Sequence, residues 1–114
     1  MNKQQILDMV VSQYYKQPYR CPPTGECRYH LGGDECFISP LLYGFWQDEM
    51  EGSSVREIAR KFPVPNWFSE NIDFIDKLQR MHDNETIWES GFMKIAFKNL
   101  AQEYGLILIQ EIAY

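Results

Sequence analysis

The feature of this chain that most restricts its fold is an apolar stripe close to the C-terminus. Within it, apolar residues recur at alternating gaps of three and one: Met93, Ala96, Phe97, Leu100, Ala101 and Tyr104. This spacing places them on one face of an α-helix, and that face must pack against the rest of the chain to leave water. Gly105 follows directly, where glycine commonly ends a helix in the left-handed conformation. The stripe therefore predicts a helix over residues 92–104.

Three more helices are predicted from apolar periodicity and from residues that cap helix starts. Residues 3–16 carry an apolar face, and Asn2 stands at the capping position before them. Ser54 begins a capping box ahead of a second short apolar stripe. Ser69 is predicted to cap a third helix, and Thr86 begins another capping box ahead of the C-terminal helix.

A glycine pair in the first half of the chain predicts a β-hairpin. Gly32-Gly33 suits the positive φ angles of a tight turn, and the flanking segments 27–31 and 34–39 have the length of strands. The apolar run 106–112 is also of strand length and can add a third strand, since two strands alone are marginally stable. We therefore expect an α+β fold, with about four helices packed on a small antiparallel sheet that contains the hairpin near residues 27–39.

Composition indicates the class of protein. The chain has 114 residues and is 45% hydrophobic, which suits a single globular domain spanning residues 1–114. Its net charge of −5 disfavours binding to a nucleic-acid backbone. No apolar run reaches the roughly 20 residues of a membrane span, and the N-terminus lacks the basic start and apolar centre of a signal peptide. Together with an odd number of cysteines, these features predict a cytoplasmic protein without membrane association.

Four short motifs occur along the chain: Gly25-Glu26-Cys27-Arg28-Tyr29, Cys36-Phe37-Ile38, Glu51-Gly52-Ser53-Ser54-Val55 and Leu78-Gln79-Arg80-Met81-His82-Asp83. In this order they resemble a group of small uncharacterised bacterial and phage proteins with Cys-x-Tyr, Cys-Ala-Ile-Gly, Glu-Gly-x-Ser-Val and Leu-Gln-x-x-His-Asp motifs. The similarity runs over about residues 19–106, and the chain departs from it at Phe37, Ser39 and Pro40. The resemblance implies one domain with this order of elements, and a phage origin would suit an inhibitor or adaptor of a host system. It transfers no catalytic residue.

Four residues in the first part of the chain are of the types that bind zinc: Cys21, Cys27, His30 and Cys36. Their spacing differs from the paired Cys-x2-Cys knuckles of common zinc folds. Side chains alternate across a strand, so the predicted hairpin puts Cys27 and Cys36 on one sheet face and His30 on the other. We therefore favour two small cysteines buried in a sheet face, and keep a zinc site at these four residues as the alternative.

A second alternative is a cysteine enzyme centred on Cys36. His82 can act as its base if the fold brings the two together, with Asp83 or Glu35 orienting the imidazole. A reactive cysteine usually needs a helix N-terminus or another positive environment to form thiolate. Cys36 lies between Glu35 and Phe37 and has neither in the sequence. A histidine in the last turn of a helix also has a structural use, because it interacts favourably with the exposed carbonyls there.

Aromatic residues make up 15% of the chain, more than a core of this size requires. Several lie in the segments 41–46 and 63–68, which have no regular periodicity to assign them inward. On these segments we predict an interaction surface: Tyr43, Phe45, Trp46, Trp67 and Phe68. The open alternative is that these rings cover the core, because large rings bury much area per residue.

The leading hypothesis is therefore a non-catalytic binding protein that acts through a protein partner or by self-association. The alternative is a small Cys/His enzyme or zinc-binding protein centred on Cys27, Cys36 and His82. The two differ in whether His82 lies against a cysteine. No glycine-rich phosphate loop or dinucleotide fingerprint is present, so we expect no cofactor.

Overall fold

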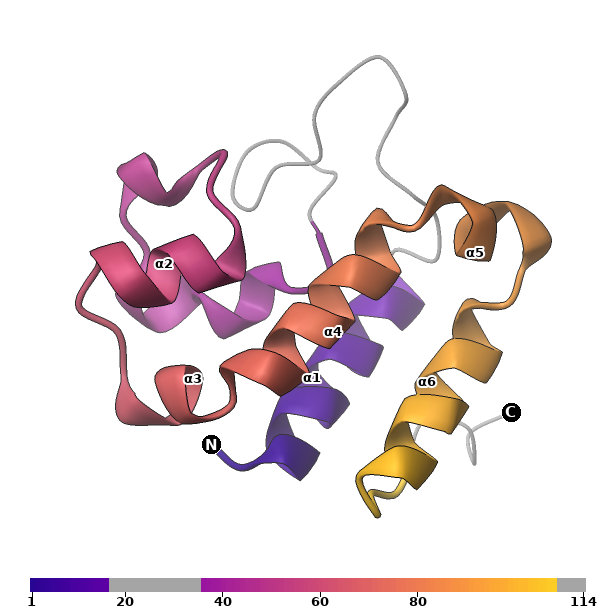
Figure 1. The fold of residues 1–114 in the computed structure, drawn as a ribbon. Coiled ribbons are helices and arrows are strands. Elements are labelled where there is room, and N and C mark those ends of the chain that lie inside the picture. The colour runs from indigo at the N-terminus through magenta and orange to yellow at the C-terminus, as the bar shows by residue number, and fades with distance from the viewer. Residues whose placement is uncertain (17–35, 109–114) are drawn as a thin grey trace.

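The computed structural model describes residues 1–16 and 36–108, and its regular elements in these ranges are helices (Figure 1). In chain order they are α1 (Lys3–Lys16), η1 (Ser39–Leu41), η2 (Tyr43–Phe45), η3 (Asp48–Met50), α2 (Val55–Lys61), α3 (Asn66–Glu70), α4 (Ile72–Asp83), α5 (Glu85–Ser90) and α6 (Met93–Glu103), where η marks a 3-10 helix. The predicted α+β fold is wrong, because the described parts of the expected strands, residues 36–39 and 106–108, form no strand. None of the described helices has both the length and the apolar character needed to cross a membrane.

A tight turn occupies the position where the sequence predicts the second strand of the hairpin. The amide of Ser39 donates to the carbonyl of Cys36 at 3.0 Å. Cys36, Phe37 and Ile38 are all buried, whereas a strand with one face in water alternates buried and exposed side chains. Consecutive buried residues with local backbone hydrogen bonds suit a chain that turns inside the core. The rest of the predicted hairpin, residues 27–35, lies outside the described residues.

The segment after α6 is held on α1 without joining a sheet. The amide of Ile107 donates to Oε1 of Gln4 at 2.9 Å, and Nε2 of Gln4 donates to the Ile107 carbonyl at 2.7 Å. Leu106 and Leu108 are half-buried while Ile107 is exposed, so this stretch alternates as a strand does. A side-chain amide of α1 thus takes the place that a neighbouring strand would occupy. Residues 109–112 of the predicted strand lie outside the described residues.

Local signals in the sequence locate three helix ends. The predicted first helix is confirmed as α1, and Asn2 and Gln5 exchange side chain-to-backbone hydrogen bonds at its start, each at 2.9 Å. The Ser54 capping box is confirmed, since Ser54 and Glu57 form both of its hydrogen bonds. Gly105, just beyond α6, has a φ of 67°, as expected of a glycine that ends a helix.

Ser69 and Thr86 do not cap helices, contrary to the prediction. Ser69 lies inside α3, and Asn71 stands at the start of α4. Thr86 lies inside α5, where the side chain of Asn84 accepts a hydrogen bond from the amide of Ile87 at 3.1 Å. In both places a nearby asparagine stands at the helix start, which is a position that asparagine favours as much as serine does.

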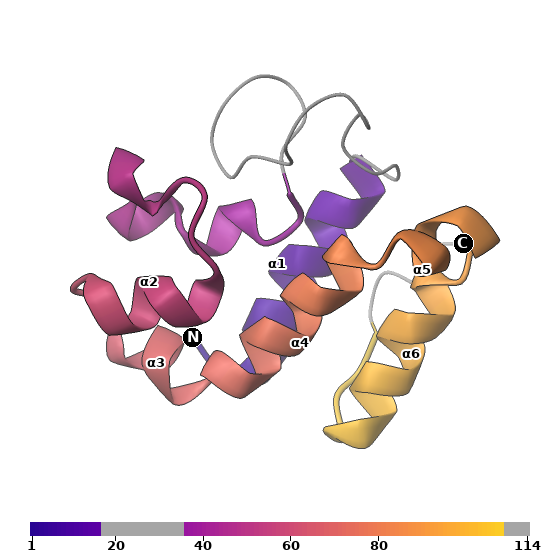
Figure 2. The same ribbon diagram turned by 45° about the horizontal axis from the view of Figure 1, so that its top comes forward.

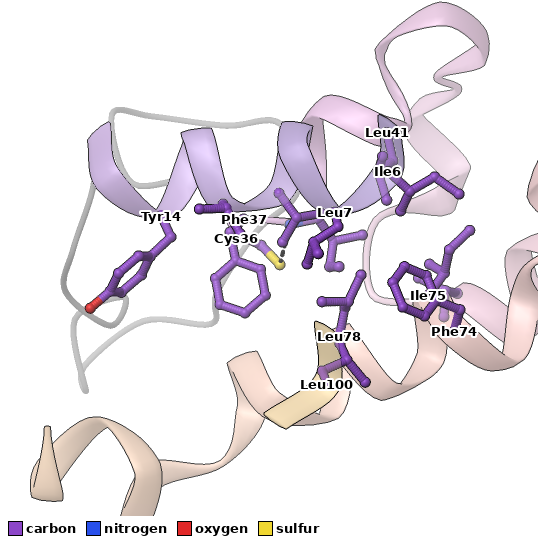
Figure 3. Packing of buried hydrophobic residues seen from close by; sticks show 14 of the residues in the cluster. Ile6, Leu7, Tyr14, Cys36, Phe37, Leu41, Phe74, Ile75, Leu78 and Leu100 are labelled. Carbon is purple, nitrogen blue, oxygen red and sulfur yellow. Dashed lines mark hydrogen bonds between the residues drawn. The ribbon is translucent and has the colours of Figure 1, made fainter. Parts of the chain in front are cut away.

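The helix α4 lies at the centre of the arrangement and crosses α1 (Figures 1 and 2). α2 and α3 lie on one side of α4, and α6 lies on the other. Figure 3 shows Leu7 of α1 and Leu78 of α4 pointing towards each other, with Phe37 beside them. All three are buried, so the core fills the space between α1, α4 and the turn before η1.

Polar groups fix α2 on α4. The amide of Val55 donates to Oε1 of Gln79 at 3.0 Å. Nε of Arg56 donates to Oδ2 of Asp76 at 3.0 Å, and the same carboxylate oxygen lies 3.1 Å from Nε of Arg80. Two arginines therefore share one nearly buried carboxylate of α4.

Candidate functional site

The imidazole of His82 lies inside a group of rings that we call the interior aromatic cluster. Its members come from α1, α4, α5, α6 and the turn before η1: Tyr14, Phe37, His82, Trp88 and Phe97. The His82 ring meets Phe37 edge-on, with 4.7 Å between ring centroids, and meets Trp88 at 5.8 Å. Nε1 of Trp88 donates to the backbone carbonyl of His82 at 2.7 Å. Because His82 is only 3% exposed, its imidazole is packed as a core ring.

Of the predicted Cys36, His82 and Asp83 group, the neighbours His82 and Asp83 are in contact, and Cys36 is connected to them through its chain neighbour Phe37. Nδ1 of His82 lies 3.4 Å from Oδ1 of Asp83. Phe37, which follows Cys36 in the sequence, contacts the imidazole. The sulfur of Cys36 accepts a hydrogen bond from the amide of Ile38 at 3.4 Å, which is drawn in Figure 3.

The Cys36 thiol is protonated at neutral pH. Burial is the main cause that raises its pKa to about 12, and the negative charges of Asp83 and Glu51 act in the same direction. A nucleophilic cysteine needs the opposite surroundings, in which positive charge lowers the pKa and stabilises the thiolate. The surroundings of Cys36 therefore suit a structural core residue.

The candidate zinc site has one described residue, Cys36. Cys21, Cys27 and His30 lie outside the described residues, and Cys36 alone of the four is described. Within residues 1–16 and 36–108, no three side chains of the His, Cys, Asp or Glu types are arranged to hold a metal ion. The zinc alternative therefore stays a prediction.

The predicted loop aromatics lie in η2, in the residue after it and in α3, and three of them, Phe45, Trp67 and Phe68, are in ring contact. We call them the surface aromatic cluster: Tyr43, Phe45, Trp46, Trp67 and Phe68. The ring centroid of Phe45 lies 6.2 Å from that of Trp67 and 5.3 Å from that of Phe68, at interplanar angles of 70° and 74°. Such edge-to-face contacts are favourable for aromatic pairs. The fold thus joins the two segments that the sequence singles out.

Exposure differs among the rings of the surface aromatic cluster. Tyr43 is 50% exposed, and Phe45, Trp46 and Trp67 are half-buried. Phe68 is fully buried and belongs to the core. The predicted interaction surface therefore has four partly exposed rings and one buried ring, Phe68, which contacts Phe45 and Trp67.

A groove between α4, α5 and α6 is not predicted by the sequence. Its volume is about 590 Å³. The apolar residues lining it are Met81, Ile87, Ala96 and Leu100, and the polar ones are Lys77, Arg80, Asn84, Asn99 and Glu103. We call it the α4–α6 groove. Ala96, one of two small side chains in the apolar stripe of the C-terminal helix, is the local signal that could have located it.

An ion pair joins the two long walls of the α4–α6 groove. Nζ of Lys77 on α4 lies 3.1 Å from Oε1 of Glu103 on α6. The same Nζ lies 5.0 Å from the centroid of the Tyr104 ring, within range of a cation–π contact. These contacts hold the C-terminal end of α6 against α4.

Comparisons with protein families, with curated proteins and with solved structures found no match for this chain. The resemblance to small bacterial and phage proteins therefore stays a prediction. The function has to be inferred from the chain's own residues and their geometry.

Proposed function

We propose that this protein is a small non-catalytic binding protein that acts at its surface aromatic cluster, through a protein partner or a second copy of itself. One observation carries the proposal: Phe45 and Trp67 stay partly exposed while they pack on the fully buried Phe68, and the partly exposed Tyr43 and Trp46 lie within two residues of Phe45. Aromatic side chains are enriched at the centres of protein interfaces and among the residues that contribute most to binding. An inhibitor or adaptor, as the resemblance to phage proteins implies, is one form that such binding can take.

The rings are positioned before any partner arrives. Phe45 and Trp67 pack edge-on against the buried Phe68. Pro63 and Pro65 restrict the backbone that leads into α3. Side chains that are already ordered lose less conformational entropy on binding, so a preorganised cluster favours affinity.

A Cys/His enzyme has less support as a second candidate. The thiol of Cys36 is buried and its pKa is raised to about 12, so little thiolate is present for nucleophilic attack. The imidazole of His82 is enclosed by Phe37 and Trp88. A substrate would have to enter the core to reach either group.

Site-specific photo-cross-linking in the source cells tests the proposal. A photoreactive phenylalanine replaces Tyr43 in one variant and Ile107, an exposed residue outside the surface aromatic cluster, in the control. We expect one dominant cross-linked protein from position 43, identified by mass spectrometry, and none shared with position 107. A product of twice the chain's own mass identifies the partner as a second copy.

The identified partner then has to bind the purified protein directly. Trp67→Ser is expected to weaken that binding by roughly tenfold or more, as for a residue near an interface centre. Cross-linking with equal yield from both positions, or binding that Trp67→Ser leaves unchanged, contradicts the proposal.

A further inference from the structure

Two neighbouring amides in the segment after α6 are held by different parts of the molecule. The amide of Leu106 donates to the carbonyl of Ala101 at 2.8 Å, a hydrogen bond that closes the C-terminal end of α6. Gly105, between them, has the positive φ that this kind of helix ending requires. The next amide, that of Ile107, donates instead to Oε1 of Gln4 on α1 at 2.9 Å. The chain therefore passes from its own helix to α1 between Leu106 and Ile107.

The side chain of Gln4 pairs with Ile107 in one orientation only. Its Nε2 donates to the carbonyl of Ile107 at 2.7 Å and to Oδ1 of Asp8 at 2.9 Å. A carboxamide nitrogen has two N–H donors, so both are in use, while Oε1 accepts from the Ile107 amide. If the carboxamide were turned end for end, its oxygen would face the Ile107 carbonyl and the Asp8 carboxylate, which are both acceptors. Asp8 is therefore a positioning residue for Gln4.

The segment after Leu106 is packed less tightly than the helix beneath it. Leu108 is half-buried against the core and Ile107 is 64% exposed, whereas Ile6 and Val10 of α1 are fully buried. Both hydrogen bonds between Gln4 and Ile107 are exposed to solvent. Segments with few buried apolar contacts and exposed hydrogen bonds open at a lower free energy than the core does. This segment can therefore leave α1 while α1 stays folded.

We propose that the segment beginning at Ile107, of which the structure describes residues 107–108, is a strap that opens from α1 as a separate unit, with the Gln4 carboxamide as its latch. Opening breaks the two hydrogen bonds between Gln4 and Ile107 and lifts Leu108 off the core. The helix ending at Leu106 stays formed, so the strap pivots between Leu106 and Ile107. None of these residues belongs to the surface aromatic cluster, so the strap is independent of the proposed function.

Hydrogen–deuterium exchange of single amides in the full chain, followed by NMR, tests the strap. We expect the amide of Ile107 to exchange faster than that of Val10 in the unaltered chain, because the strap opens without α1. Gln4→Ala should speed exchange at Ile107 about five- to tenfold, since two solvent-exposed hydrogen bonds are lost. The amides of Leu106 and Val10 should keep their rates, which also establishes that the variant is folded.

Three further variants assign the latch. Gln5→Ala is the matched control, because Gln5 is the next residue of α1 and its side chain accepts from the amide of Asn2 instead of reaching Ile107. It should leave exchange at Ile107 unchanged. Asp8→Ala should speed exchange at Ile107 by a smaller factor than Gln4→Ala does. Asp8→Asn, which keeps an acceptor oxygen, should restore the rate.

Each part of the proposal has a result that overturns it. Unchanged exchange at Ile107 in Gln4→Ala would show that Gln4 is not the latch. Equal acceleration at Ile107, Leu106 and Val10 would show that the segment opens only when the helices unfold, so that there is no separate strap. A rate at Ile107 that Asp8→Ala leaves unchanged would remove Asp8 from the latch.

Discussion

The interior and surface aromatic clusters share one kind of contact but differ in what they can do. Both contain near-perpendicular ring pairs, with centroids 4.7 Å apart for Phe37 and His82 and 5.3 Å apart for Phe45 and Phe68, and the interior cluster adds tilted pairs such as Tyr14 and Phe97. The interior aromatic cluster joins five parts of the chain and encloses its only histidine among the described residues. The surface aromatic cluster joins two segments and leaves Tyr43 half exposed. Four of the five interior rings are buried and Trp88 is half-buried, whereas Phe68 alone is buried among the five surface rings. This difference in burial decides which cluster mainly stabilises the fold and which is more available to a partner.

The comparison also separates the two functional hypotheses. The residues for cysteine–histidine chemistry, Cys36 and His82, lie at the interior aromatic cluster, where both are buried. The residues for binding lie at the surface aromatic cluster. Substitutions in the interior aromatic cluster should consequently lower stability, whereas substitutions in the surface aromatic cluster should weaken partner binding.

The largest expected difference is in stability. Phe37→Ala should lower the free energy of unfolding by about 3–5 kcal/mol, because it removes a buried ring and leaves a cavity. Tyr43→Ala should change it by only about 0.5 kcal/mol, as substitutions at the surface do. Urea denaturation followed by circular dichroism measures both. A similar loss of unfolding free energy for the two variants would show that the two clusters do not differ in how much they stabilise the fold.

A matched pair of tryptophans gives the next largest effect. Nε1 of Trp88 donates to the backbone carbonyl of His82 at 2.7 Å, whereas Nε1 of Trp46 donates to the exposed carboxylate of Asp48 at 3.1 Å. Trp88→Phe should cost about 1–2 kcal/mol, because a part-buried acceptor loses its donor. Trp46→Phe should cost less than about 0.5 kcal/mol, because water replaces the donor to Asp48. Equal costs in urea denaturation would contradict this assignment.

The sequence predicts the helices better than it predicts what lies between them. The Ser54 capping box and Gly105 act through neighbouring residues, so short-range signals are sufficient to locate them. The turn at residues 36–39 forms because its side chains are buried against α1 and α4. The spacing of apolar residues in the sequence does not predict this packing. The sequence singles out the aromatics of the surface aromatic cluster, but the burial of Phe68 depends on how α3 packs against the rest of the fold. The α4–α6 groove depends on the separation of two helices, and only Ala96 hints at it.

The remaining expected effect is absent at neutral pH and arises from Cys36. The pKa of its thiol is about 12 in the folded protein and 9.0 for an ordinary thiol, so the unfolded chain releases its proton first as the pH rises. The contribution of Cys36 to the free energy of unfolding is therefore fully present below about pH 9. It is progressively lost as the pH rises from there towards the pKa of the thiol in the folded protein.

This effect is measured by comparing two variants. Both carry Cys21→Ser and Cys27→Ser, and the second carries Cys36→Ala in addition. The difference between their free energies of unfolding should be constant below pH 9 and should shrink above it, while tyrosines and lysines affect both chains equally. A difference that already declines near neutral pH would mean that burial does not raise the pKa of the Cys36 thiol.

The affinity of the purified protein for its cross-linked partner is the measurement that decides between the clusters. Trp67→Ser in the surface aromatic cluster should weaken binding by roughly tenfold or more, and Trp88→Phe in the interior aromatic cluster should leave it unchanged once both variants are folded. The reverse order, with Trp88→Phe weakening binding and Trp67→Ser neutral, would show that the protein acts at its interior aromatic cluster and not at its surface.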